Sequence, residues 1–321
     1  MTRELKAFWI VAVVAALAPT SATAQNGVSR SQIDTTVRLD RGGAVDLSLI
    51  SGRIRVTGWD RPDVKISASI ESGLLQFNAN SSRVTLSVDE DGDHDDDDDS
   101  GRRRRRNHNV GDARYEVSVP RGSRLILEAV SGNVTASGSQ GEIDASSVSG
   151  NVSVSDGVRS VSAESVSGSV TVTQVNGSLR TETVSGDLRA QDVTGNVEAE
   201  SVSGNIHLVR VQSRDVRSET VSGDIIYTGT IEPSGRYSFD SHSGTLRLNI
   251  PRGTGAQFSV ETFSGDLSTD FPVTLPPRSG RREGRVEFTI GDGRARVTAQ
   301  TFSGRIIINN GSDSATRRDD E

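Results

Sequence analysis

The sequence predicts an all-β fold, a single-stranded parallel β-helix or β-solenoid with coils of about 18 residues. The first observation is a Ser-Gly dipeptide that recurs at a fixed interval: Gly132, Gly150, Gly168, Gly186 and Gly204 are each 18 residues apart. A period this short is typical of a solenoid, in which each repeat buries its apolar face only against its neighbours. We expect a right-handed stack, and no segment of the repeat has helical spacing.

The second observation is the composition. Aromatic residues make up 4% of the 321 residues, so the core must be assembled from small Val, Ile, Leu and Ala side chains. The chain has no Cys, which excludes a Cys nucleophile, a thiolate zinc site and any disulfide. The formal net charge of -7 argues against nucleic-acid binding, which needs a basic face.

The N-terminus has the order of a secretory signal peptide, which we assign to residues 1–24. Arg3 and Lys6 precede an apolar run from Ala7 to Ala18, and the segment ends in Ala22-Thr23-Ala24. We expect cleavage after Ala24 and no transmembrane anchor afterwards, because the apolar run is shorter than the roughly 20 residues that span a bilayer. The mature protein is therefore expected in the periplasm or at the cell surface.

Residues 25–40 are expected to be a lead-in, and residues 41–308 to be the solenoid. The repeat reaches back to Ser51-Gly52, which is followed by apolar residues in the same register as in the later coils. Alternating stretches between this first coil and Ser131, such as Arg83 to Val88, predict further strands.

Within each coil a half-period of nine residues predicts one short strand and a corner. Apolar residues fall two, four and seven positions after each Gly, as in Val170, Val172 and Val175 after Gly168. After Gly177 the same positions hold Leu179, Thr181 and Val184, and we expect them to form the buried face. We also expect each Gly to supply a positive φ, and the Asn or Asp that often follows it to form ladders between coils.

A charged insert interrupts the repeat at residues 89–110. It consists of an acidic block from Asp89 to Asp99 followed by Arg102 to Arg106. Such a segment has no apolar area to offset its ordering entropy, so disorder is expected. The alternative is weak binding of divalent cations by the acidic block and of anionic headgroups by the arginines. The spacing fits no EF-hand loop.

The repeat of the sequence becomes irregular after Gly265. Residues 272–285 are rich in Pro and Arg and predict a loop, and strands resume from Val286. The last coil, residues 301–308, is expected to cap the stack, because terminal repeats must block edge pairing. Residues 309–321 are expected to be a polar tail.

These residues together resemble a known family. Ser51 to Asp60, Tyr115 to Leu125, the run of Val-Ser-Gly-Asn/Asp-Val coils and Thr262 to Leu267 resemble the bacterial putative-adhesin family, a domain of unknown function related to the head-GIN adhesin domains. The resemblance covers roughly residues 40–308. It implies an exported parallel β-solenoid in the envelope or at the surface, with no established enzymatic activity and no site residues to transfer.

An acidic column is the main candidate site. Four residues before successive Ser-Gly glycines the chain places Glu164, Glu182, Glu200, Glu219, Asp240 and Glu261. Stacked coils align such residues at about 4.8 Å, so the repulsion between them needs solvent, arginine partners or a counter-ion. Candidate partners are Arg180, Arg189 and Arg217. The alternatives are an exposed polar edge and a linear groove for cationic ligands or, weakly, Ca²⁺; we assign no metal site and no cofactor.

The sequence therefore predicts a non-enzymatic exported scaffold that binds a surface polymer, such as a polysaccharide, through a repetitive polar face. The alternative is a periplasmic structural protein that binds an envelope protein. A polysaccharide-active β-helix enzyme is a third candidate, by analogy of fold alone. We assign no catalytic residues, because the acids are dispersed by the repeat and no histidine recurs beside them.

Overall fold

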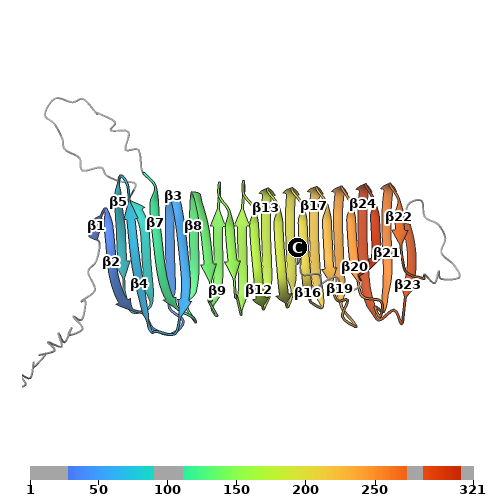
Figure 1. Cartoon of the computed structure of the whole chain (residues 1–321), viewed down its shortest axis with the longest axis horizontal. Coiled ribbons are helices and arrows are strands. Elements are labelled where there is room, and N and C mark those ends of the chain that lie inside the picture. Colours follow the sequence, from blue (N-terminus) through green and yellow to red (C-terminus); the bar gives the residue numbers. More distant parts are fainter. Residues whose placement is uncertain (1–27, 90–110, 273–284, 312–321) are drawn as a thin grey trace, which may run out of the picture.

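The computed structural model describes residues 28–89, 111–272 and 285–311, and within these residues the chain forms strands and no helix. The strands lie side by side along one long axis, with the N-terminal strands at one end (Figure 1). The predicted fold class, an all-β solenoid, is confirmed. The predicted signal peptide, most of the charged insert and of the Pro/Arg-rich loop, and the end of the polar tail lie outside the described residues.

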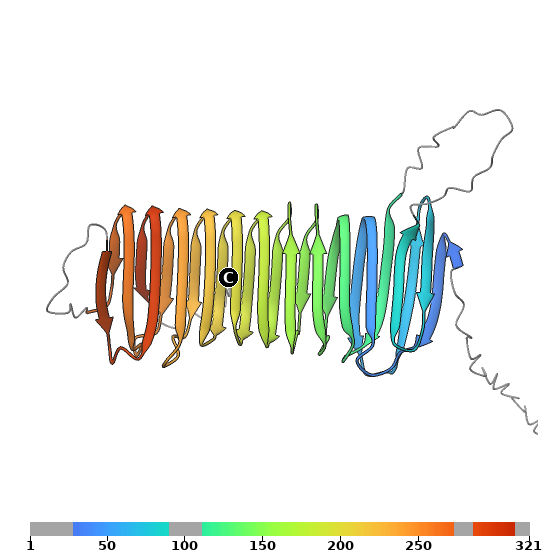
Figure 2. The same cartoon turned by 180° about the vertical axis from the view of Figure 1, so that it is seen from behind.

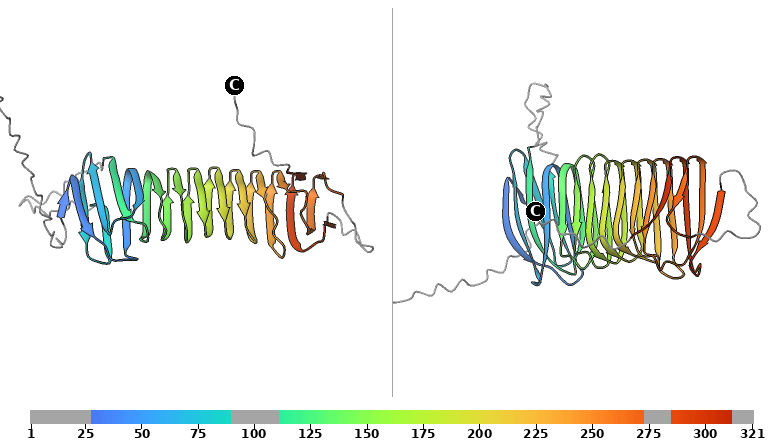
Figure 3. Two further views of the ribbon diagram at one scale, coloured as in Figure 1. Left: turned by 60° about the horizontal axis from the view of Figure 1, so that its bottom comes forward. Right: turned by 45° about the vertical axis from the view of Figure 1, so that its right-hand side comes forward.

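Each coil contributes one strand to each of two faces of the stack (Figure 3). The first face, here called face A, contains β9 (Glu142–Ser147), β11 (Ser160–Ser165), β13 (Ser178–Ser185), β15 (Val197–Ser203), β17 (Asp215–Ser222), β19 (Arg236–Ser243), β21 (Ala256–Ser264) and β24 (Ala295–Ser303). The second, face B, contains β10 (Val152–Ser155), β12 (Val170–Asn176), β14 (Leu188–Thr194), β16 (Ile206–Gln212), β18 (Ile225–Gly229), β20 (Leu246–Ile250), β22 (Leu267–Thr269) and β25 (Ile306–Asn310).

The parallel register follows the repeat of the sequence. Val170 pairs with Leu188 and Val152 on face B, and Leu179 pairs with Val161 and Val197 on face A. Each pair is one repeat apart, so like residues stack on like residues. Inward side chains of the two faces form one continuous core of small apolar residues, each contributing about 1.5–3 kcal/mol when fully buried.

The N-terminal end of the stack contains antiparallel strands. β3 (Ala44–Trp59) and β8 (Arg124–Ser137) are long and contribute to both faces, and their parallel pairing places Ser51 opposite Ser131. Beyond β3, face A continues through β6 (Arg83–Asp89), β5 (Leu74–Ala79) and β1 (Val28–Arg30). Face B continues through β7 (Ala113–Pro120), β4 (Asp63–Ile70) and β2 (Gln32–Arg38), so strands begin within the expected lead-in.

The prediction that the last coil caps the stack is wrong. β24 lies between β19 and β21 on face A, and β25 lies between β20 and β22 on face B. Figure 2 shows this coil in red between strands coloured orange. The end of face A is instead β23 (Arg285–Ile290), which pairs antiparallel with β21. The chain therefore passes over one coil position, builds the terminal coil, and returns to fill the gap.

The buried pattern differs between the two faces. On face B the predicted buried positions, two, four and seven residues after the Gly, are confirmed, because Val170, Val172 and Val175 are all buried. On face A it fails at the third position: Thr183 turns into the core, and Val184 is 46% exposed. The reason is that strand alternation continues without a bulge on face A, so each Val before the Ser-Gly corner points outward.

Candidate functional site

A groove of about 860 Å³ runs along face A beside the Ser-Gly corners. Its walls and floor come from one short segment of each coil, the residues that end the face A strands. The lining residues are Ser146, Ser147, Val148, Glu164, Ser165, Val166, Glu182, Thr183, Val184, Glu200, Ser201, Val202, Glu219, Thr220, Val221, Asp240, Ser241, His242, Glu261, Phe263, Gln300, Thr301 and Phe302.

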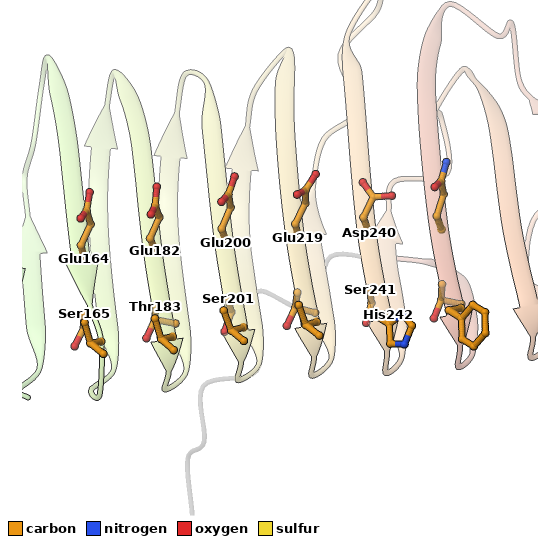
Figure 4. A pocket seen from close by; sticks show the side chains of 18 of the residues that line it. Glu164, Ser165, Glu182, Thr183, Glu200, Ser201, Glu219, Asp240, Ser241 and His242 are labelled. Carbon is orange, nitrogen blue, oxygen red and sulfur yellow. The ribbon is translucent and has the colours of Figure 1, made fainter. Parts of the chain in front are cut away.

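The predicted acidic column forms one wall of this groove. Glu164, Glu182, Glu200, Glu219 and Asp240 pair in register on consecutive face A strands, and Figure 4 shows their carboxylates in one row. All six predicted acids line the groove. The sixth, Glu261, is not next to Asp240, because β24 places Gln300 between them.

Small hydroxyl side chains form the floor. In the coils of β9, β11 and β13, the hydroxyls of Ser147, Ser165 and Thr183 donate to the carbonyl oxygen of a glycine in the preceding coil, at 2.8, 2.9 and 3.2 Å. Figure 4 shows Ser165, Thr183, Ser201 and Ser241 in a second row beside the acids. The three hydroxyls of β9, β11 and β13 are hydrogen-bonded within the stack, whereas the buried Oγ of Ser201 and Oγ1 of Thr301, also in the floor, have no hydrogen-bond partner among the described residues.

An apolar stripe forms the opposite wall, and sequence reasoning assigned its residues to the core. The outward Val of each coil is about half exposed, with 46% for Val166, 48% for Val202 and 52% for Val221. Towards the C-terminal end the stripe becomes aromatic. Phe302 stacks on His242 and on Phe263, with ring centroids 4.9 Å apart in both pairs. Phe263 is 79% exposed, so the groove ends in an accessible aromatic surface.

Two arginines neutralise alternate members of the acidic column. Arg180 forms ion pairs with Glu182 and, at 2.5 Å, with Glu198. Arg217 pairs with Glu219 at 2.6 Å. Two of the three candidate partners therefore have the predicted role. Arg189 does not, because it lies on face B, where its Nη2 donates to Gln191.

The remaining acids form no ion pair among residues 28–89, 111–272 and 285–311, although Arg180 lies near enough to Glu200, and Arg217 to Asp240, to lower the pKa of each slightly. They are Glu164, Glu200, Asp240 and Glu261. Hydroxyls contact two of them: Ser162 Oγ donates to Glu164 at 3.2 Å, and Ser238 Oγ donates to Asp240 at 2.9 Å. Arg285 faces Glu261 across the antiparallel pair but forms its ion pair with Glu287.

The groove raises the pKa of two of these carboxyls. Burial is the main cause for Glu200, and the neighbouring carboxylates of Glu182, Glu198 and Glu219 add to it. Burial also raises the pKa of Asp240, with a smaller contribution from Glu219, although the hydrogen bond from Ser238 works in the opposite direction. Ionisation of these two carboxyls therefore costs free energy in the folded protein.

Other sites have little support in the part of the chain that the structure describes. That part contains no group of three or more His, Asp or Glu side chains arranged to hold a metal ion, and no helix long and apolar enough to cross a membrane. Most of the insert 89–110, the second predicted interaction region, lies outside it. The acids of the groove stand in a row and do not converge on one point.

The family model of the Toastrack domain DUF4097 matches residues 45–309, which is most of the chain and nearly the whole solenoid. The chain belongs to the Toastrack DUF4097 family. This agrees with the resemblance that the repeat motifs indicate, a putative-adhesin domain of unknown function. No curated protein matches the chain.

Three solved structures are similar to this Toastrack protein at low identity. A putative cell adhesion protein from Clostridium sporogenes is 10% identical, with 87% of this chain and 99% of that chain covered and a TM-score of 0.24. A putative adhesin from Bacteroides fragilis is 12% identical, with 87% and 98% covered and a TM-score of 0.39. A putative lipid binding protein from Parabacteroides distasonis is 13% identical, with 88% and 96% covered and a TM-score of 0.41.

Proposed function

We propose that this Toastrack protein is an exported, non-enzymatic scaffold that holds an extended ligand, such as a surface polymer, along the groove of face A. The observation that carries the proposal is the continuity of the groove over many coils with two chemically different walls. A row of acids faces a row of half-exposed apolar side chains, so each coil offers the ligand one polar and one apolar contact. Many such weak contacts add up when one molecule engages all of them.

The signal-like N-terminus supports a periplasmic or surface location for this scaffold. A non-enzymatic role fits the dispersal of the acids, because glycoside hydrolysis requires a pair of carboxyls on opposite sides of one bond. In this groove neighbouring carboxyls repeat along one wall and the facing wall is apolar.

The second candidate, an envelope protein as the partner, is favoured by the apolar stripe. A purely polar face would suit a hydrated polysaccharide, whereas a stripe of exposed Val and Phe residues is typical of a protein-binding surface. In this case the scaffold would bind an extended segment of another protein, with no catalytic step.

Retention of envelope material on the immobilised mature protein tests the binding role. Val202→Trp places a large ring in the groove from a position that is already half exposed, so the core is not affected. Val158→Trp is the matched control, because Val158 is 45% exposed and does not line the groove. We expect Val202→Trp to lose retention and Val158→Trp to keep it. Equal retention by both variants would exclude the groove.

The retained material distinguishes the two candidates. Carbohydrate that resists protease treatment favours a surface polymer, and protease-sensitive material favours an envelope protein. Weak Ca²⁺ binding by the carboxylate row is a separate prediction: added calcium should raise the Tm of the mature protein, and an unchanged Tm counts against it.

A further inference from the structure

We propose that the groove binds a peptide segment in the polyproline II conformation that carries a cationic residue at every third position. The inference rests on the proposed binding role of the groove and names the class of ligand. It follows from the spacing of charge along the groove, from the groove's width and from the apolar stripe.

Charge alternates along the acidic wall from coil to coil. Read along the stack, Glu164, Glu200, Asp240 and Glu261 occupy every second position. The positions between them carry less negative charge, because Glu182 and Glu219 pair with arginines and Gln300 carries no charge. Neighbouring strands lie about 4.8 Å apart, so the unpaired carboxylates repeat at about 9.6 Å.

A polyproline II helix has nearly the same period. It turns once in about three residues and rises about 3.1 Å per residue, so one side of it repeats at about 9.3 Å. In an extended β-strand, one side repeats at about 6.6–6.8 Å, which falls out of step with the carboxylates after one interval. In an α-helix, one side repeats after seven residues, which is a distance of about 10.5 Å. The helix with its side chains is also about 10–12 Å wide.

The two walls of the groove lie close together, which disfavours an α-helix about 10–12 Å wide. Its two walls are residues two positions apart on one strand, such as Glu200 and Val202, so their Cα atoms are about 6.6–6.8 Å apart. A ligand cannot join the floor as an extra strand, because the strands there already pair on both sides. Polyproline II needs no such pairing, since it makes no backbone hydrogen bonds of its own and needs no sheet edge.

The second wall suits proline. The half-exposed valines offer a flat apolar strip, and the stack of His242, Phe302 and Phe263 provides aromatic surface at one end. Pro-rich segments dock on aromatic surfaces of this kind in several unrelated domains. A ligand with arginine on one side and proline on the other two would place each chemistry against its complementary wall.

Fluorescence anisotropy with two peptide isomers tests the spacing. One labelled peptide is (Pro-Pro-Arg)₄, and the other contains the same residues as Pro₈Arg₄. Both have the same length, composition and charge, so the main difference between them is the spacing of the cations. We expect the spaced peptide to bind about tenfold more tightly at physiological salt. Affinities within twofold of each other, or no saturable binding of the spaced peptide, would overturn the proposal.

Variants of the protein test whether the spacing of its carboxylates sets this preference. Glu200→Gln removes one of the regularly spaced charges and should lower the affinity for the spaced peptide several-fold. Glu116→Gln, on an exposed site of β7 away from the groove, is the charge-matched control and should leave affinity unchanged. Gln300→Glu adds a charge at a neutral position, so the preference for the spaced isomer should decrease. An unchanged preference in Gln300→Glu would contradict the role of the alternation.

The outcome separates this inference from the proposed function. If Val202→Trp abolishes retention of envelope material and the wild-type protein binds neither peptide, the groove binds a ligand of another class. If that material is protease-resistant carbohydrate, the ligand is a polysaccharide and the peptide proposal is wrong. If Val202→Trp also leaves retention unchanged, both proposals fail.

Discussion

The glycines of the Ser-Gly column are required for a reason that the sequence did not show. We expected them to supply a positive φ, and Gly52, Gly223 and Gly244 do, at 122°, 156° and 152°, whereas Gly150, Gly168 and Gly186 do not. A Cβ on Gly186 would instead lie 2.3 Å from the carbonyl oxygen of Gly168 in the coil before it. The close approach of successive coils therefore excludes any side chain. The expected ladder of Asn and Asp is confirmed where Asn133 Oδ1 accepts from the backbone N–H of Asn151 at 2.9 Å.

Gly186→Ala should destabilise the protein by about 1–3 kcal/mol, because the backbone of two coils must separate to admit the methyl group. Gly122→Ala is the control, since a Cβ there has no neighbour within 4 Å. Urea denaturation of the two variants measures the difference. Equal midpoints would show that the coils do not approach as closely as the structure indicates.

Four of the five non-glycine residues with a positive φ in the described part of the chain lie in a different column, at the bulge of the face B strands. Asp156, Gln174, Asp192 and Arg210 have φ between 53° and 58°, and each is 18 residues from the next. Asp192 and Arg210 gain from an ion pair between coils, at 2.5 and 2.6 Å, which lowers the pKa of Asp192 through its hydrogen bonds to Arg210. Gln174 is exposed and occupies an unfavourable conformation for a residue with a Cβ.

Gln174→Gly should therefore raise the free energy of unfolding by about 0.5–1 kcal/mol, the left-handed strain less the entropy cost of glycine. Thr171→Gly, in the regular part of the same strand, should lower it by about 0.5–1 kcal/mol. Chemical denaturation compares the two. A destabilised Gln174→Gly would contradict the assignment of strain to this position.

Asp240 predicts a pH dependence of stability. Its pKa is raised in the folded protein, so the folded state binds the proton more tightly, and ionisation above that pKa destabilises the fold. Asp240→Asn removes this cost and should raise the Tm at neutral pH. The advantage should shrink as the pH falls below the raised pKa and disappear below the usual pKa of aspartate, about 3.9. Thermal melts across this range check the prediction; an advantage that does not change with pH would contradict it.

At the scale of elements, the position of β24 is the feature that changes the site. Because β24 lies inside the stack, Gln300 separates two acids that the order of the sequence makes neighbours. The alternation of charge over the C-terminal half of the groove depends on this one crossing. Face A strands contribute in another way: their unbroken alternation turns the hydroxyl residues inward and the valines outward.

Hydrogen exchange tests the internal position of β24. Its amides should be as well protected as those of β17, because both strands have a parallel partner on each side. Amides of β23, whose pairing in the described chain is with β21 alone, should exchange faster. If β24 exchanges as fast as β23, it is the terminal strand after all, and the charge alternation is lost with it.

At the scale of the whole molecule, stability is distributed along one dimension. Each coil contacts the coils before and after it, so the removal of one complete coil leaves two surfaces that match each other. Removal of half a coil joins a face B strand to a face A position and misaligns every column beyond the cut.

Deletion of residues 169–186, one repeat, should give a folded protein with a Tm within a few degrees of the wild type. Deletion of residues 169–177 should abolish cooperative unfolding, because the Ser-Gly corners on the two sides of the cut no longer stack. Circular dichroism melts distinguish the two outcomes. The longer deletion also removes Arg180 and Glu182, so Glu164 and Glu200 become neighbours, and the preference for the spaced peptide should decrease.

The sequence by itself determined the class of fold, the register of the coils and the membership of the acidic column. The reason is that a fixed period brings residues 18 apart into contact whatever the remaining details are. It did not determine which way Val184 points. Continued strand alternation after Thr181 turns Val184 outward, whereas a corner or bulge would turn it inward, and the sequence is compatible with both. Nor did it determine where β24 lies, because that depends on pairing between distant strands. Only the tertiary structure showed that an apolar wall faces the acids and that acids without an ion pair alternate with paired or uncharged positions.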